Sequence, residues 1–321
     1  MPRTGARRTD RPRYHRRLPA PNRLDAVAVE PRTRPRSCGR RGRYPDPVPA
    51  SPPSWTSAAS ALDADLEFAL RLADAADTVT MARFRATDLD LRVKDDATFV
   101  TDADLAAERA LRGLLARERP ADAVSGEEFG REGSGPRRWI LDPIDGTHNY
   151  LRGIPMWATL IALAVDDVPR LGVVSQPAIG RRWWAASGGG AWTNADGGAR
   201  SIRVSDVDAL AHASISFQSI AQWDEAGRVR DLIRVSRAVW RDRGYGDAWP
   251  YMMLAEGRLE MVAEFGVKEY DIAAHAAIIA EAGGRLTAAD GAPSLVTGTV
   301  LATNGALHES FVRLLDAEGA A

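Results

Sequence analysis

Apolar residues recur along this chain with two periods, one typical of helices and the other of strands. Residues 61–82 carry leucine and alanine at intervals of three and four, which predicts an amphipathic helix. Its apolar stripe contains Leu62, Leu66, Leu70 and Ala73. A second helix is expected at 102–118, where Thr101 or Asp102 can cap it and Pro120 ends it. Each helix can bury its apolar stripe against a sheet.

Strands and helices then alternate through the rest of the chain. Short apolar runs predict strands at 139–141, 157–165, 171–175, 182–186, 214–217, 260–264 and 300–303. Helical spacing predicts helices at 221–235, 248–257, 272–282 and from about residue 306. No internal repeat interrupts this pattern. An alternation of this kind predicts an α/β fold in which layers of sheet and helix pack on each other.

Acidic residues gather where these elements end, and the clearest cluster follows the strand at 139–141. There Asp142 and Asp145 stand three residues apart, with Pro143 and one apolar residue between them. We expect Pro143 to end the strand and Gly146 to allow a tight turn. The two carboxylates then lie at the carboxyl end of a strand, where open α/β sheets bind ligands. The alternative is an ordinary turn rich in Asp and Asn.

Three further acidic clusters lie at element boundaries beside apolar sequence. Glu127 follows a short apolar run, Asp104 stands in the first turn of the helix at 102–118, and Asp271 precedes the helix at 272–282. A solvated face would scatter its charges at helical spacing among Lys and Arg. Carboxylates held together repel each other unless a cation lies between them. Ligand sets made only of oxygen suit Mg²⁺ or Mn²⁺.

These motifs resemble, in type and in order, those of the inositol monophosphatase family. The resemblance extends from about residue 62 to about residue 315. It rests on Gly126-Glu127-Glu128, Asp142-Pro143-Ile144-Asp145-Gly146-Thr147 and Tyr270-Asp271. It implies a layered α-β-α-β-α sandwich of the inositol monophosphatase and fructose-1,6-bisphosphatase type. It also implies Mg²⁺-dependent, lithium-sensitive hydrolysis of small phosphate monoesters.

The resemblance implies ligands for two magnesium ions, which Mn²⁺ can replace. Glu127, Asp142 and the carbonyl of Ile144 would hold the first ion, so Glu127 counts among the catalytic residues. The second ion would be held by Asp142, Asp145 and Asp271. Asp142 then bridges the two ions, at the spacing of roughly 4 Å that two-metal hydrolases show. A third, weaker ion can bind near Glu127.

The resemblance also assigns catalytic roles around Thr147. Thr147 would orient the attacking water, and Asp104 would accept the proton through the Thr147 hydroxyl. The backbone N–H groups of Gly146 and Thr147 would cradle the phosphate. Capping is the structural alternative for Asp104, but we expect Asp102 to be the cap of the helix at 102–118.

Two carboxylates bear on which phosphate monoester is the substrate. Glu264 matches a family glutamate that contacts the polar part of the substrate. Asp247 heads the helix at 248–257, where simple inositol phosphatases carry a small residue. A carboxylate there favours a cationic leaving group such as histidinol, which has an ammonium and an imidazole. Segment 243–251 and Tyr270 resemble the bacterial histidinol-phosphatase branch. The alternative is inositol 1-phosphate or another sugar or nucleotide phosphate, with Asp247 as a helix N-cap.

Other polar and aromatic residues near these motifs are expected to have structural roles. Imidazole is rare at oxygen-selective Mg²⁺ sites, so we expect His148 at the rim of the site and His275 as a satisfied helix residue. Tyr251 is expected in the core. Arg181 and Arg182 are expected to be solvated.

Charge divides the chain into two parts. The 321 residues carry a net charge of −1, yet residues 1–56 hold 14 Arg, no Lys and four acidic residues, a net of +10 that leaves −11 for the remainder. Eleven of the 19 prolines also lie there. This segment has too little apolar sequence to offset chain entropy, so we expect it to be disordered. We expect 57–321 to be the catalytic domain, made of two α/β halves at about 57–200 and 201–321.

Three functions are open for residues 1–56: a basic arm for nucleic acid, an organelle-targeting peptide, or a dispensable extension from a misplaced start. Proline density argues against a helical targeting peptide, and a core of −11 would repel a phosphate backbone. We therefore favour the dispensable extension and expect no nucleic-acid partner. No apolar stretch of about 20 residues is present for a membrane span. The one cysteine, Cys38, lies in this segment, which fits a cytoplasmic protein. The family resemblance implies a homodimer.

Overall fold

The structure, a computed structural model, describes residues 61–94, 99–194 and 198–316. The predicted extension at 1–56 lies outside these residues. The described helices are α1 Ala61–Arg83, α2 Asp102–Glu118, α3 Thr147–Leu151, α4 Ile220–Glu225, α5 Val229–Ala238, α6 Ala248–Ala255, α7 Glu269–Glu281 and α8 His308–Asp316. The described strands are β1 Leu91–Val93, β2 Phe99–Thr101, β3 Ala123–Gly126, β4 Gly130–Glu132, β5 Arg137–Asp145, β6 Ala158–Val165, β7 Val168–Gln176, β8 Arg181–Ala186, β9 Ala191–Thr193, β10 Arg200–Ile202, β11 Ser214–Ser216, β12 Arg241–Arg243, β13 Met261–Phe265, β14 Arg285–Thr287 and β15 Thr299–Thr303.

The larger sheet has the strand order β10-β9-β8-β7-β6-β5-β3-β4. Its neighbouring strands are antiparallel except β3 and β5, which are parallel. Both faces of its central strands are covered, so apolar residues follow one another without alternation. In β5, Trp139 and Leu141 pack toward α1 and α2, whereas Ile140 packs toward α6 and α7. This explains why the sequence shows a continuous apolar run there.

The smaller sheet has the order β12-β11-β13-β15-β14. The strands β12, β11 and β13 run parallel, and β13, β15 and β14 pair antiparallel. Its two faces are also both buried. Val262 packs toward α6 and α7, while Met261 and Ala263 pack toward the outer helices.

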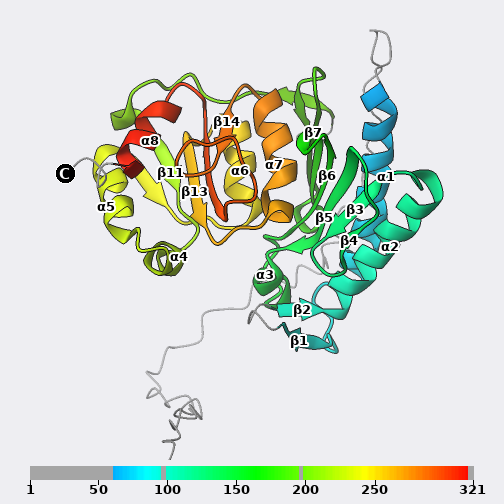
Figure 1. The fold of residues 1–321 in the computed structure, drawn as a ribbon. Coiled ribbons are helices and arrows are strands. Elements are labelled where there is room, and N and C mark those ends of the chain that lie inside the picture. The colour runs from blue at the N-terminus through cyan, green and yellow to red at the C-terminus, as the bar shows by residue number, and fades with distance from the viewer. Residues whose placement is uncertain (1–60, 95–98, 195–197, 317–321) are drawn as a thin grey trace, which may run out of the picture. The chain divides into compact units, whose positions relative to one another are not determined.

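Five layers result, and Figure 1 shows α6 and α7 between the two sheets. Helices α1 and α2 pack on one face of the larger sheet, and α7 packs on the other. Helix α6 contacts α7, β13 and β15, while α4 and α8 contact the far face of the smaller sheet and α5 packs on α8. This order of helix, sheet, helix, sheet and helix confirms the predicted α-β-α-β-α sandwich. The predicted division at about residue 200 stays a prediction; the strands of the two sheets lie before residue 203 and after residue 213.

Gly172 sets how closely α7 approaches the larger sheet. A Cβ atom at this position would lie 2.3 Å from the carbonyl oxygen of Ala274 in α7. Only a hydrogen atom fits in that space, so the helix and β7 are in direct backbone contact. This contact fixes the position of α7 against the larger sheet. The first turn of α7 carries Asp271.

Two local predictions were wrong. The single helix expected at 221–235 is two helices, α4 and α5, because Gly227 turns the chain with a φ of 70°. Pro143 does not end its strand, because β5 continues to Asp145 through an irregularity in its pairing with β6. Among the described residues, no helix is long and apolar enough to cross a bilayer.

Candidate active site

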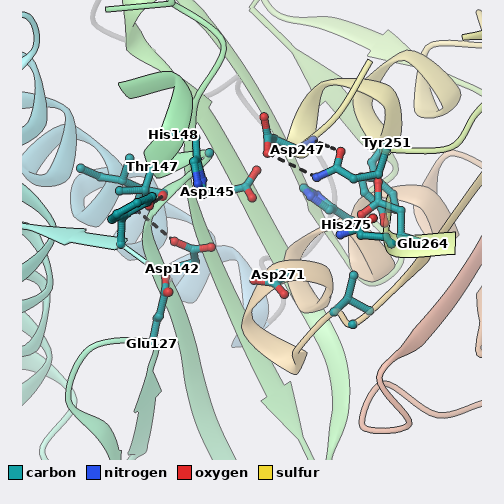
Figure 2. A pocket seen from close by; sticks show the side chains of 17 residues that line it. Glu127, Asp142, Asp145, Thr147, His148, Asp247, Tyr251, Glu264, Asp271 and His275 are labelled. Carbon is teal, nitrogen blue, oxygen red and sulfur yellow. Dashed lines mark hydrogen bonds between the residues drawn. The ribbon is translucent and has the colours of Figure 1, made fainter. Parts of the chain in front are cut away.

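A cavity of about 220 Å³ brings together residues from the larger sheet, the smaller sheet and the helices α6 and α7. Nine of the ten predicted site residues line it, the exception being Asp104. These are Glu127, Asp142, Ile144, Asp145, Gly146, Thr147, Asp247, Glu264 and Asp271. Figure 2 shows the carboxylates of Asp142, Asp145 and Asp271 pointing into a common space.

The irregularity in β5 explains how Asp142 and Asp145 face the same cavity. Residues three apart in a regular strand point to opposite faces of the sheet. Here the register with β6 shifts between Asp142 and Asp145, and such bulges redirect side chains. Asp142 is 1% exposed, and its carboxylate accepts a hydrogen bond of 3.1 Å from the N–H of Ile144.

The other carboxylates arrive from the ends of distant elements. Glu127 follows β3, and its N–H bonds to the carbonyl of Leu141 in the parallel strand β5 at 3.1 Å. Asp271 lies in the first turn of α7, where its carboxylate accepts the N–H of Lys268 at 2.6 Å. Asp145 accepts the N–H of Ala248, the first residue of α6, at 2.6 Å. Helix starts thus position two of the four acids, as expected for anions near the positive end of a helix.

Burial and mutual repulsion raise the pKa values of Asp142, Asp145 and Asp271. Burial raises the pKa of Asp142 well above its usual value, and the charges of Glu127 and Asp145 raise it further. Burial and the charge of Asp247 do the same for Asp145. The pKa of Asp271 is raised to about 7, mainly by burial. The cavity therefore favours any ligand that brings positive charge.

Asp247 and Glu264 lie on the side of the cavity formed by the smaller sheet and α6. Asp247 occupies the N-cap position of α6, but its side chain makes no capping hydrogen bond to the helix. Its carboxylate instead accepts a hydrogen bond from Asn149 at 2.7 Å. Glu264, in β13, is 4% exposed, and its Oε1 has no hydrogen-bond partner among the described residues. Burial raises the pKa of Glu264 well above its usual value.

Comparison with known proteins agrees with the layered fold and this acidic cavity. A model of the inositol monophosphatase family matches residues 61–320. The chain belongs to the inositol monophosphatase family. Enzymes of this family are metal-dependent phosphatases that typically use Mg²⁺.

Individual relatives support the same assignment. The histidinol-phosphatase of Streptomyces coelicolor is 49% identical over 257 residues, covering 78% of this chain and 97% of that protein. The histidinol-phosphatase of Mycobacterium tuberculosis is 48% identical over 255 residues, covering 79% and 98%. Among solved structures, the extragenic suppressor protein suhB from Bartonella henselae superposes with a TM-score of 0.72 at 27% identity, covering 78% of this chain and 98% of that chain.

The chemistry of the cavity fits the metal ions of this inositol monophosphatase family. Within the described part of the chain, no three Asp, Glu, His or Cys side chains already converge on one ion position. The acids instead bond to the protein: Asp145 and Asp271 to backbone N–H groups, and Glu127 to Lys94. The oxygen donors of these acids and the raised pKa values of Asp145 and Asp271 nevertheless match a hard divalent cation.

Lys94 is a site residue that the sequence analysis missed. Its ammonium group lies 2.8 Å from Glu127 Oε1 and 2.9 Å from Glu128 Oε1. A signal was available, because the chain has 40 Arg but only two Lys, Lys94 and Lys268. In the sequence, Lys268 lies next to the Tyr270-Asp271 motif, and Lys94 is followed by Asp95 and Asp96. An ammonium is a compact charge with three donors, which suits it to neutralising two adjacent carboxylates.

The surroundings of Asp104 bear on two predictions, the N-cap of α2 and the partner of the Thr147 hydroxyl. Thr101, not Asp102, is the N-cap of α2, and Asp104 completes a capping box with it. Asp102 instead pairs with Arg83 at 2.9 Å. The Thr147 hydroxyl donates to the carbonyl of Ile144 at 3.1 Å rather than to Asp104. Asp104 Oδ1 is buried and has no partner among the described residues, and burial raises the pKa of Asp104 to about 6.

Three further residues differ from expectation. Arg182 is buried rather than solvated, because α1 covers β8 and supplies Asp74 and Asp77 at 2.8 and 2.5 Å. His275 is not satisfied, since its Nδ1 has no partner among the described residues, and burial lowers its pKa to about 3. Tyr251 is buried as expected, but it also lines the cavity and stacks on His275 at 4.4 Å.

Proposed function

We propose that this protein hydrolyses L-histidinol phosphate to L-histidinol and inorganic phosphate. The observation that carries the proposal is that half-buried Asp247 and buried Glu264 line the same cavity as the acidic cluster of Asp142 and Asp145. Histidinol carries an ammonium group and an imidazole, and both can donate hydrogen bonds to carboxylates. The two relatives named histidinol-phosphatase, at 49% and 48% identity, support the same substrate.

We assign phosphate binding, orientation of the water and proton transfer to separate residues of the protein. Gly146, with a φ of 86°, turns the chain so that α3 begins at Thr147. The first N–H groups of a helix have no partner within it, and we assign those of Gly146 and Thr147 to the phosphate oxygens. We assign Thr147 to orienting the attacking water. Proton transfer to Asp104 then requires the Thr147 hydroxyl to exchange the carbonyl of Ile144 for the unpartnered Oδ1 of Asp104.

We assign two magnesium ions to Glu127, Asp142, the Ile144 carbonyl, Asp145 and Asp271, with a third, weaker ion near Glu127. Mg²⁺ would neutralise the phosphoryl charge and lower the pKa of a bound water. We expect Mn²⁺ to substitute, because it accepts the same oxygen ligands. We also keep the homodimer and the cytoplasmic location as predictions.

The test is phosphate release by the purified chain with Mg²⁺, comparing histidinol phosphate with inositol 1-phosphate at equal concentrations. We expect a large preference for histidinol phosphate in kcat/KM. Asp247→Asn and Glu264→Gln, which keep size and remove charge, should each reduce that preference. A wild-type preference for inositol 1-phosphate would leave the family chemistry intact and overturn the proposed substrate.

A further inference from the structure

Two residues with strained backbone conformations meet on the side of the cavity formed by the smaller sheet and α6. The proposed function assigns this side to the leaving group. Gln218, in the loop after β11, has a φ of 43°, and Asp247 has a φ of 53° with a ψ of −151°. Side chains disfavour positive φ, and the conformation of Asp247 lies near a region that is essentially restricted to glycine. Strain of this kind persists only where surrounding contacts hold it, and it concentrates at functional sites. Both residues line the cavity.

The amide of Gln218 holds Asp247 from two directions. Its Oε1 accepts the backbone N–H of Asp247 at 2.8 Å, and its Nε2 lies 3.5 Å from Asp247 Oδ1 as a donor. Figure 2 marks these contacts of Asp247 with dashed lines. A single side chain therefore fixes both the strained backbone and the carboxylate of Asp247.

Asn149, in α3, holds the other carboxylate oxygen. Its Nδ2 donates to Asp247 Oδ2 at 2.7 Å and to the carbonyl of Met156 at 2.7 Å. Asn149 and Asp247 are 98 residues apart in the sequence. The same amide also bonds to Met156. It therefore fixes the position of Asp247 relative to the segment that also carries the acidic cluster.

Two glycines leave room for this arrangement. A Cβ at Gly146 would lie 3.2 Å from the carboxylate carbon of Asp247, and one at Gly246 would lie 2.8 Å from Gln218 Oε1. The partners of Asp247 are neutral amides, which leave its negative charge uncompensated by any bonded cation among the described residues. A carboxylate has about four acceptor sites, so Asp247 can still accept bonds from a ligand.

We propose that Gln218 and Asn149 are positioning residues, whose amides hold the Asp247 carboxylate at the leaving-group side and so set the preference for a monoester with a cationic organic half. The inference rests on the proposed function. A positioned charge discriminates between ligands because a carboxylate that a bound ligand shields from water is costly without a cationic partner, whereas a cation satisfies it.

The test compares two substrates in three variants. Gln218→Met removes the amide at nearly constant size. Gln218→Asn keeps an amide, but on a side chain too short to make both contacts with Asp247, and Asn tolerates the positive φ of this position. We expect each to lower kcat/KM for histidinol phosphate about tenfold, mainly through KM, the size of loss expected for a weakened charge-assisted contact. The kcat/KM for phenyl phosphate, which lacks a cation, should change less than about twofold in the same variants. Gln222→Met is the matched control, because Gln222 lines the same cavity and its Oε1 has no partner among the described residues. It should leave the ratio between the two substrates unchanged.

A double-mutant cycle separates positioning from an independent role. If Gln218 acts through Asp247, adding Gln218→Met to Asp247→Asn should cause no further loss with histidinol phosphate. Additive losses would overturn the inference, as would an unchanged substrate ratio in both Gln218 variants. If instead the wild-type protein shows no preference for histidinol phosphate over inositol 1-phosphate, the proposed function itself fails, and the two failures are thereby distinguished.

Discussion

Asp271 allows a direct test of the electrostatics of the site, because its pKa is raised to about 7 from 3.8. Burial is the largest cause, and the charge of Glu127 adds to it, while the N–H of Lys268 acts in the opposite direction. We predict that Asp271→Asn makes the metal-free protein more stable at pH 8, although it removes a residue assigned to metal binding. The asparagine keeps an oxygen that can accept the Lys268 N–H.

The size of the effect follows from the two pKa values. Moving a pKa from 3.8 to about 7 corresponds to roughly 4 kcal/mol, at about 1.4 kcal/mol for each pH unit. The folded state binds the proton more tightly, so stability falls as pH rises from 3.8 to 7. Above pH 7 the full cost is present, and below pH 3.8 it vanishes. Because neighbouring acids share this repulsion, we expect Asp271→Asn to gain roughly 2–4 kcal/mol at pH 8 and almost nothing at pH 4.

The assay is urea unfolding with a chelator at pH 8 and pH 4. Asp224→Asn is the control, because Asp224 is exposed and is not among the residues that line the cavity. Adding Mg²⁺ at pH 8 should then stabilise the wild-type protein and leave the Asp271→Asn variant nearly unchanged. The reasoning is refuted if the Asp271→Asn variant is no more stable than wild type at pH 8, or gains equally at both pH values.

Four further predictions concern catalysis, inhibition by lithium, packing and the extension. Asp142→Asn should abolish turnover while circular dichroism shows an intact fold; near-normal activity with Mg²⁺ would contradict the metal assignment. Lithium should inhibit, and insensitivity would count against the family mechanism. Gly172→Ala should destabilise the fold by about 1–3 kcal/mol or more in urea unfolding, because its Cβ would lie 2.3 Å from Ala274 O; an unchanged midpoint would contradict this. Deleting 1–56 should leave phosphatase activity unchanged, and lost activity would contradict a dispensable extension.

Local features of the sequence were enough to find the acids of the cavity. Asp142 and Asp145 follow an apolar run and Asp271 directly precedes one, and the resemblance of their motifs led to the correct family and layered fold. Local sequence did less well with capping. Thr101, Asp102 and Asp104 all suit a helix start, so only the backbone conformation around Thr101 showed which of them caps α2.

Contacts between distant segments could not be predicted in the same way. Lys94 reaches Glu127 across 33 residues, and Arg182 reaches Asp74 across 108. From sequence alone, a charged side chain is expected to be solvated unless its partner is known. Its burial depends on which element covers it.

The sequence by itself determined the class of protein: the periodicity of its apolar residues indicates layers of sheet and helix, and the resemblance of its acidic motifs to those of the inositol monophosphatase family indicates a phosphatase. Only the tertiary structure decided how the cavity is assembled. The bulge that turns Asp142 and Asp145 to one side depends on pairing with β6, and the hold of Asn149 on Asp247 spans 98 residues. Periodicity reports which face of an element is buried, whereas the orientation of a polar side chain depends on partners that folding brings together.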